Sequence, residues 1–106
     1  MLLHRRTFPV YWEDVKRSRS ENSPNMLGGH LEPKVAFGKV LRRFRKDAGL
    51  SQEQLALEAG VRRTYVSLIE LGQNQPTITV LFKLAAALRC RPSELIEHTE
   101  QECADP

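Results

Sequence analysis

The sequence lacks the residues from which disulfide frameworks, zinc sites and membrane spans are built. Its 106 residues include two cysteines, Cys90 and Cys103, with neither CxxC spacing nor a histidine pair nearby, which argues against a zinc site. We expect one buried thiol, one thiol in a tail, and no metal or other cofactor. The longest apolar run spans residues 84–88, whereas a helix that crosses a bilayer needs about 20 apolar residues. The sequence therefore predicts no membrane partner.

Signals for secretion, for β-structure and for catalysis are also missing. No apolar block of secretory length occurs in residues 1–25, so we expect a cytoplasmic protein. No segment alternates polar and apolar residues with period two, which argues against a sheet. No nucleophile–base spacing, phosphate-binding glycine loop or paired-carboxylate cleft is present, which argues against an enzyme. The three histidines lie in or beside segments without periodicity: His4, His30 and His98.

Positive charge is concentrated in the middle of the chain. The net charge of the whole sequence is +3, but residues 34–73 hold eight lysines and arginines against four acidic residues, a balance of +4. The last eight residues hold three acidic residues and no basic one. This distribution favours a polyanion as the partner, although solvated helix faces can carry a similar pattern.

Residues 1–31 differ in composition from the rest of the chain. They combine Pro9, Pro24 and a Ser/Asn/Arg stretch with one small apolar cluster at residues 8–12. This apolar content is too low to offset the ordering entropy of a packed segment, so we expect an irregular arm. Alternatively, the arm docks on the domain or reaches along DNA. Met26 lies just before the domain, and one hypothesis is that translation starts there.

Residues 32–98 are predicted to form one compact all-α domain of five short helices, followed by an acidic tail at 99–106. Ser51 and Gln54 form a capping-box pattern. The residues that suit the beginnings and ends of helices are, in chain order, Pro33, Gly49, Ser51, Gly60, Gly72, Thr77 and Pro92. Apolar residues at helical spacing mark the inward faces: Phe37, Leu41, Phe44 and Ala48; Leu55, Ala56 and Ala59; Val61, Val66 and Ile69; and Ile78, Leu81, Leu84, Ala85 and Leu88. In the short fifth helix, Leu95 and Ile96 are apolar.

The functional signal lies in residues 50–72, LSQEQLALEAGVRRTYVSLIELG. Two short helices are separated by the turn at residues 59–61, which is too tight for antiparallel packing, so the helices must cross at a steep angle. The second helix then presents outward the residues that its core face does not use: Arg62, Arg63, Thr64, Ser67, Leu68 and Leu71. Arginines and hydroxyls at the start of an outward helix fit insertion into the major groove of DNA.

From Val35 to Glu97 the sequence resembles the Cro/CI-type helix-turn-helix family, also called XRE or lambda-repressor-like. The resemblance rests on a continuous register of motifs: GLSQEQLA, GVRRTYVSLIELG and NQPTITVLFKLAAALRCRPSEL. The stretch RTYVSLIELGQNQPTI is also similar to the small controller proteins of restriction–modification systems. This resemblance implies a five-helix lambda-repressor-like fold and a sequence-specific transcriptional regulator that inserts the helix near residues 62–71 into the major groove of double-stranded DNA.

The resemblance also implies roles for single residues. The expected base contacts are Arg62, Arg63, Thr64, Ser67 and Leu68. Arg63 could bind guanine O6 and N7; the alternative is a solvated arginine. For Leu68 the alternative is packing on a neighbouring side chain. Arg62 stands where the family usually has a Ser or Thr N-cap, which weakens capping of this helix; in exchange, Arg62 could contact a phosphate or a base. The expected phosphate contacts are Gln52, Tyr65, Gln73 and Asn74. For Gln52 the alternative is a polar residue at a helix start, and for Tyr65 it is packing. Arg45 and Glu70 match the family's internal ion pair.

The fourth helix is apolar almost all round, since Val80, Phe82 and Ala86 add to its inward set. We therefore expect a homodimer through the fourth and fifth helices, with recognition helices about 34 Å apart on a pseudo-palindromic operator. The alternative is a scattered apolar surface without assembly. A competing function is an antitoxin or protein-interaction module that also binds DNA and engages a protein partner through the N-terminal arm or the C-terminal tail.

Overall fold

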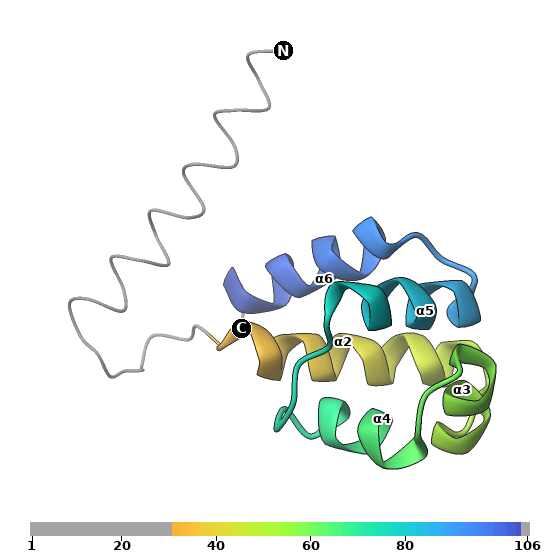
Figure 1. The fold of residues 1–106 in the computed structure, drawn as a ribbon. Helices are drawn as coiled ribbons and strands as arrows, with labels where there is room; N and C mark the ends of the chain where they lie inside the picture. The colour runs from red at the N-terminus through yellow and green to blue at the C-terminus, as the bar shows by residue number, and fades with distance from the viewer. Residues whose placement is uncertain (1–30, 105–106) are drawn as a thin grey trace.

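The structure, a computed structural model, describes residues 31–104, which fold into helices joined by short connections (Figure 1). With the labels of Figure 1, the helices are α2 (Pro33–Asp47), α3 (Gln52–Ala59), α4 (Arg63–Glu70), α5 (Ile78–Leu88) and α6 (Pro92–Ala104). No strand occurs within residues 31–104. The predicted all-α class with five helices is therefore confirmed, whereas the predicted arm at 1–31 falls, except for its last residue, outside the described part of the chain.

Helix α2 runs through the middle of the domain, with α5 and α6 on one side and α3 and α4 on the other (Figure 1). Its inward residues Val40 and Leu41 are fully buried. Ala48 is exposed, so its predicted inward position was wrong. The reason is that Ala48 follows the last residue of α2 as its C-cap, where the helical period no longer holds. Gly49 comes next with a φ of 76°, the left-handed end that the sequence predicts.

The turn between α3 and α4 forms as predicted. The Ser51 hydroxyl accepts a hydrogen bond from the Gln54 backbone N–H, and the Ser51 N–H donates to the Gln54 side chain, which completes the capping box. Gly60 has a φ of 73°, a conformation that costs residues with a Cβ atom, and it lets the chain enter α4 within three residues. Arg62, the N-cap of α4, makes no side-chain capping bond, in agreement with the weak cap expected there.

Helix α5 begins with a capped turn, because the Thr77 hydroxyl accepts a hydrogen bond from the Val80 N–H at 3.1 Å. Four of its predicted inward residues are buried: Leu81, Leu84, Ala85 and Leu88. The fifth, Ile78, is 70% exposed, so that prediction was wrong. Ile78 is the first residue of the helix and lies on the rim of an apolar groove that Pro33, Phe37 and Ile96 also line.

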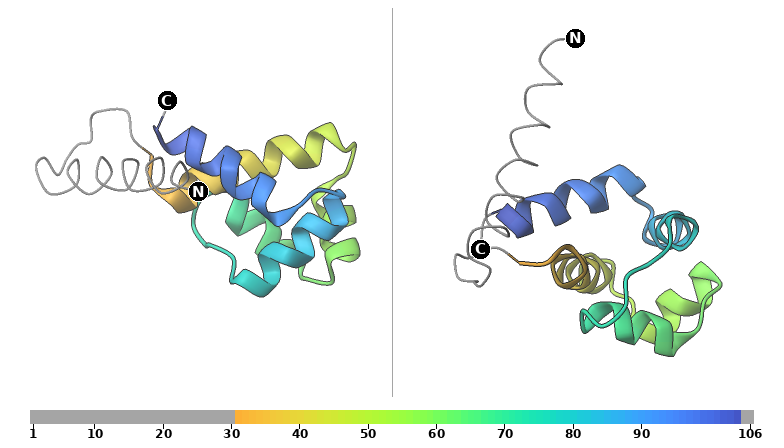
Figure 2. Two further views of the ribbon diagram at one scale, coloured as in Figure 1. Left: turned by 90° about the horizontal axis from the view of Figure 1, so that it is seen from above. Right: turned by 60° about the vertical axis from the view of Figure 1, so that its left-hand side comes forward.

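Helix α6 is longer than the short helix that the sequence predicts. Residues 99–104 continue it instead of forming a tail, so a partner-binding tail would begin only after Ala104. The helix packs along α2 (Figure 2), where His98 makes an edge-on ring contact with Phe44 and Glu102 pairs with Arg43 at 3.3 Å. The expected thiol burial is also reversed, since Cys103 is buried and Cys90 is half-buried.

Gly38 fixes how closely α4 approaches α2. A Cβ atom at this position would lie 2.4 Å from the backbone oxygen of Ile69 and 2.8 Å from that of Glu70, which is closer than atoms can pack. Only glycine therefore allows the backbone of α4 to lie against α2 at this distance. The placement of α4 on the domain depends on this contact.

Candidate nucleic-acid interface

Helix α4 has one buried face and one face open to solvent. Val66 and Ile69 are fully buried, whereas Arg62, Arg63 and Thr64 at its start are exposed. The other two predicted base-contact residues, Ser67 and Leu68, are half-buried one turn further along the helix. The structure thus gives the outward helix that the sequence predicts, with Leu68 less open than the arginines.

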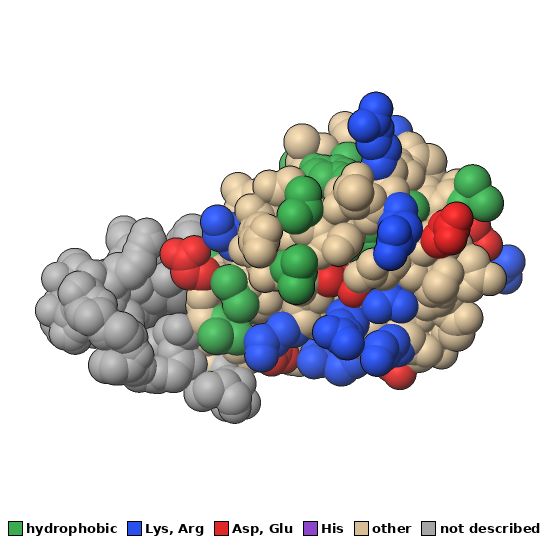
Figure 3. Space-filling model, turned by 90° about the horizontal axis from the view of Figure 1, so that it is seen from below, with side chains coloured by type: hydrophobic (Ala, Val, Ile, Leu, Met, Phe, Trp, Pro, Cys, Tyr) green, Lys and Arg blue, Asp and Glu red, His purple; other side chains and the backbone are tan. Residues whose placement is uncertain are grey.

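The start of α4 is electrostatically positive. Its first turn contains no acidic residue, and Arg62 and Arg63 add two cations where the helix dipole and unpaired backbone N–H groups already favour anions. Exposed cations continue along α2, at Lys39, Arg42 and Lys46, whereas Arg43 pairs with Glu102 of α6. Figure 3, which views the molecule from the side of α3 and α4, shows Lys and Arg side chains gathered along one edge of that face. This arrangement suits the phosphate backbone of a nucleic acid.

A buried ion pair ties α4 to α2. Arg45 donates through Nε to one carboxylate oxygen of Glu70 at 2.6 Å and through an η nitrogen to the other at 3.0 Å. The two side chains are only 10% and 4% exposed, respectively. The second η nitrogen of Arg45 donates to the backbone oxygen of Leu50 at 2.9 Å. Hydrogen bonding to Glu70 raises the pKa of the Arg45 guanidinium above its ordinary value. The pair that the family resemblance implies is thus present and also holds the α2–α3 connection.

Gln52 joins the same network, which the sequence analysis missed. Its side-chain amide nitrogen donates to Glu70 at 3.0 Å, so the first residue of α3 is linked to the last residue of α4. No local signal could have revealed this contact, because the two residues are 18 positions apart and neither capping nor periodicity relates them. The polar network therefore connects α2, α3 and α4.

The remaining predicted phosphate-contact residues lie at different depths. Tyr65 is half-buried and packs against the core, which matches its packing alternative; a phosphate contact by its hydroxyl stays a prediction. Gln73 is exposed and Asn74 is half-buried, in the loop after α4. Their backbone N–H groups both bond to the carbonyl oxygen of Leu68, at 2.9 and 3.3 Å. Because those donors are already used, DNA contact at Gln73 and Asn74 would have to come from the side chains.

The opposite part of the domain exposes apolar side chains. Ile78 and Phe82 of α5 are 70% and 57% exposed, and Ile96 of α6 is 48% exposed. Val80 is half-buried and Ala86 is exposed, so the surface of α5 is apolar beyond its core face, as the sequence predicts. We call Ile78, Phe82 and Ile96 the apolar patch.

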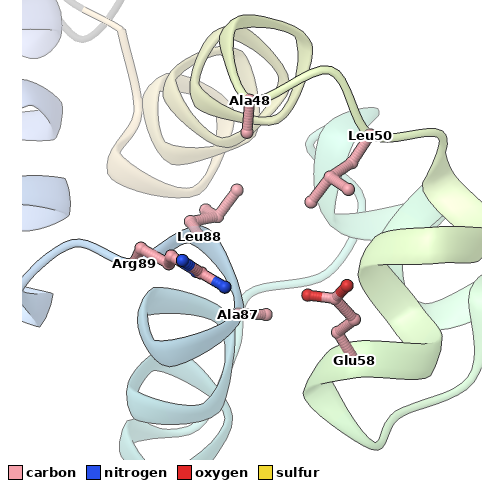
Figure 4. A pocket seen from close by; sticks show the side chains of 6 residues that line it. All are labelled: Ala48, Leu50, Glu58, Ala87, Leu88 and Arg89. Carbon is pink, nitrogen blue, oxygen red and sulfur yellow. The ribbon is translucent and has the colours of Figure 1, made fainter.

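A separate cavity of about 350 Å³ lies between the end of α2, α3 and α5. Figure 4 shows the side chains of Glu58 and Arg89 directed toward one another across it. None of the predicted DNA-contact residues lines this cavity, so it is not part of the interface. Within residues 31–104, no cluster of three or more metal-ligating side chains occurs, and no helix in that range is long and apolar enough to span a bilayer.

Comparison with known proteins relates this geometry to a family. The helix-turn-helix family HTH_3 matches residues 41–95. An HTH-type transcriptional regulator of Sinorhizobium fredii, y4dJ, is 34% identical over 71 residues, which span 67% of this chain and 92% of that protein. The crystal structure of the restriction-modification controller protein C.AhdI from Aeromonas hydrophila has a TM-score of 0.58 and 45% identity, covering 58% of this chain and 94% of that chain.

A third relative has been solved with DNA. The controller protein C.Esp1396I, as a tetramer in complex with its natural 35-base-pair operator, has a TM-score of 0.64 and 25% identity, covering 71% of this chain and 99% of that chain. Both resemblances drawn from the sequence, to the helix-turn-helix family and to controller proteins, are therefore confirmed. The chain belongs to the HTH_3 family of helix-turn-helix DNA-binding transcriptional regulators.

Proposed function

We propose that this protein regulates transcription by inserting α4 into the major groove of an operator, as a repressor or autoregulator. One observation carries the proposal: α4 turns Arg62, Arg63 and Thr64 to solvent while Val66 and Ile69 on its other face are fully buried. A helix placed in this way can reach base edges without unfolding any part of the core.

The exposed residues divide into two roles. Arg62, Arg63 and Thr64 at the start of α4, with Ser67 and Leu68 behind them, would read base edges; arginine is the side chain best suited to guanine, and Thr64 and Leu68 suit a thymine methyl group. Gln52 and the side chains of Gln73 and Asn74 flank α4 and would hold the phosphates. The cations of α2 would add attraction that does not depend on sequence.

The apolar patch supports a homodimer. Three large apolar side chains close together on α5 and α6 are costly to leave in water, and a two-fold interface would cover the patch of both copies at once. Such a dimer would present two recognition helices about 34 Å apart, which is one turn of DNA. The operator would then be pseudo-palindromic. Because its target is DNA, we place the protein in the cytoplasm. Because its relatives are transcriptional regulators and controller proteins, we propose no catalytic activity.

Selection of bound sequences from a random pool of duplexes tests this proposal. We expect enrichment of a site with two inverted half-sites whose centres lie about one helical turn apart. The enriched duplex should bind in a gel shift at moderate salt, where a scrambled duplex of the same composition does not. Equal binding to both duplexes would contradict sequence-specific regulation.

A further inference from the structure

The hydrogen bond from Gln52 to Glu70 has a consequence for DNA binding. A glutamine amide carries two N–H donors and one carbonyl acceptor. Glu70 takes one donor at 3.0 Å, which leaves one donor and the carbonyl of Gln52. Because its terminal amide is already hydrogen-bonded, the Gln52 side chain has lost much of its rotamer freedom before DNA binds. Binding DNA therefore costs it less conformational entropy.

The acceptor is itself held in place. The Glu70 carboxylate is 4% exposed and receives two hydrogen bonds from Arg45, and Arg45 is anchored in turn to the Leu50 carbonyl oxygen. The backbone at Glu70 lies against Gly38 with no room for a Cβ atom between them. The position of the Gln52 amide is thus set by α2 and α4 as well as by its own helix.

The charge balance of the network also matters. A carboxylate one hydrogen bond from Gln52 would repel an approaching phosphate, but Arg45 lies against it and makes the pair neutral overall. The pair therefore orients the Gln52 amide without adding net negative charge beside the DNA backbone.

We infer that Glu70 is a positioning residue for DNA binding: by accepting a hydrogen bond from Gln52, it presents the remaining amide donor of Gln52 to a phosphate of the DNA backbone. This role goes beyond joining α2 to α4, and it rests on the proposed function. It makes the affinity contribution of Gln52 depend on Glu70, whereas the contributions of other phosphate contacts should not depend on it.

A double-mutant cycle separates this role from a purely structural one. The background Arg45→Met/Glu70→Met replaces the buried pair with apolar side chains of similar size, an exchange that often preserves folding, and it removes the acceptor for Gln52. With a duplex enriched from the random pool, Gln52→Ala should weaken binding about tenfold in the natural sequence, as for a hydrogen bond to a charged group. In the Met/Met background, the same change should weaken binding less than about twofold.

Gln73→Ala is the matched control, because Gln73 is a predicted phosphate contact with no bond to Glu70 and its cost should be equal in both backgrounds. Since glutamine is neutral, Gln52→Ala should leave the slope of log K against log [salt] unchanged. Should the Met/Met variant fail to fold, Glu70→Gln is used as the background instead. The amide oxygen of the new side chain still accepts a hydrogen bond but carries no charge. The loss of affinity from Gln52→Ala should then lie between about twofold and about tenfold.

Equal costs of Gln52→Ala in both backgrounds would overturn the inference while leaving the proposed function intact. Failure of the natural protein to prefer the enriched duplex over a scrambled one would instead overturn the proposed function. The two failures are therefore read from different measurements.

Discussion

The two sides of α2 share one apolar core, but they differ in the polar contacts that are added to it. On one side, hydrogen bonds among Arg45, Gln52 and Glu70 tie α3 and α4 to α2. On the other side, α5 and α6 pack mainly through apolar side chains and leave the apolar patch in solvent. Hydrogen bonds are directional and fix the position of a helix, whereas apolar burial is not directional and can be extended to a second surface. One side of the domain is therefore suited to placing a helix on DNA, and the other to association.

Breaking the polar network should have the largest effect. Glu70→Ala leaves the Arg45 guanidinium buried without its partner, and we expect the free energy of unfolding to fall by about 3–5 kcal/mol. Urea unfolding followed by circular dichroism measures this loss. Glu102→Ala, which removes the more exposed pair with Arg43, is the control and should cost at most about 1 kcal/mol. Equal losses of unfolding free energy for the two variants would mean that burial of the Arg45–Glu70 pair adds nothing to its effect on stability.

Disrupting the apolar patch should change assembly and leave the fold intact. Phe82→Asp places a charge at the centre of the proposed interface, and we expect the dimer to weaken by at least about 2 kcal/mol, or thirtyfold. Sedimentation equilibrium measures the dissociation constant, and circular dichroism should stay unchanged because Phe82 is exposed. Leu57→Asp is the control, since Leu57 is 80% exposed on α3 and does not line the groove that Ile78 and Ile96 share. If only Leu57→Asp dissociates the dimer, the interface lies on the side of α3.

Truncating one side chain of α4 should separate sequence reading from backbone binding. Arg63→Ala should lose about 1–3 kcal/mol of binding free energy, confined to one base pair of each half-site. Gel shifts on duplexes substituted at each position would locate that base pair. Gln73→Ala should instead weaken binding to every duplex by a similar factor. A uniform loss for Arg63→Ala would assign this arginine to the phosphates.

The parts of the fold that the sequence predicts are those encoded by neighbouring residues. The capping box at Ser51 and Gln54 and the left-handed turns at Gly49 and Gly60 depend on a few adjacent positions, and the structure contains all of them. The length of α6 was not predicted because its inward residues after Leu95 are Thr99 and Cys103, which give no clear apolar period. The Thr99 hydroxyl bonds to the Leu95 carbonyl oxygen at 2.7 Å, so a polar residue could be buried there.

In the candidate site, too, the sequence predicts local features but not contacts between distant residues. The Arg45–Glu70 pair was expected only because the sequence resembles a family that has it, and the bond from Gln52 to Glu70 was not expected at all. The outward position of Arg63 could be predicted, since it follows from the buried spacing of Val66 and Ile69. Periodicity shows which face a residue occupies, but it does not show which distant side chain it contacts.

The smallest expected effect concerns the connection between α5 and α6. Arg89 has a φ of 60° and is the only non-glycine residue with a positive φ within residues 31–104. The left-handed conformation costs a residue with a Cβ atom roughly 1–2 kcal/mol, and Arg89→Gly would remove this cost from the folded state. Glycine also raises the conformational entropy of the unfolded chain, which offsets part of that gain. We expect a net gain of about 0.5 kcal/mol and a rise in Tm of about 3 °C. Lys83→Gly, at an exposed position inside α5 without positive φ, should instead lower Tm because glycine destabilises a helix interior. A lower Tm for both variants would mean that the Arg89 side chain, which lines the cavity beside Glu58, stabilises the folded domain by more free energy than its left-handed backbone costs.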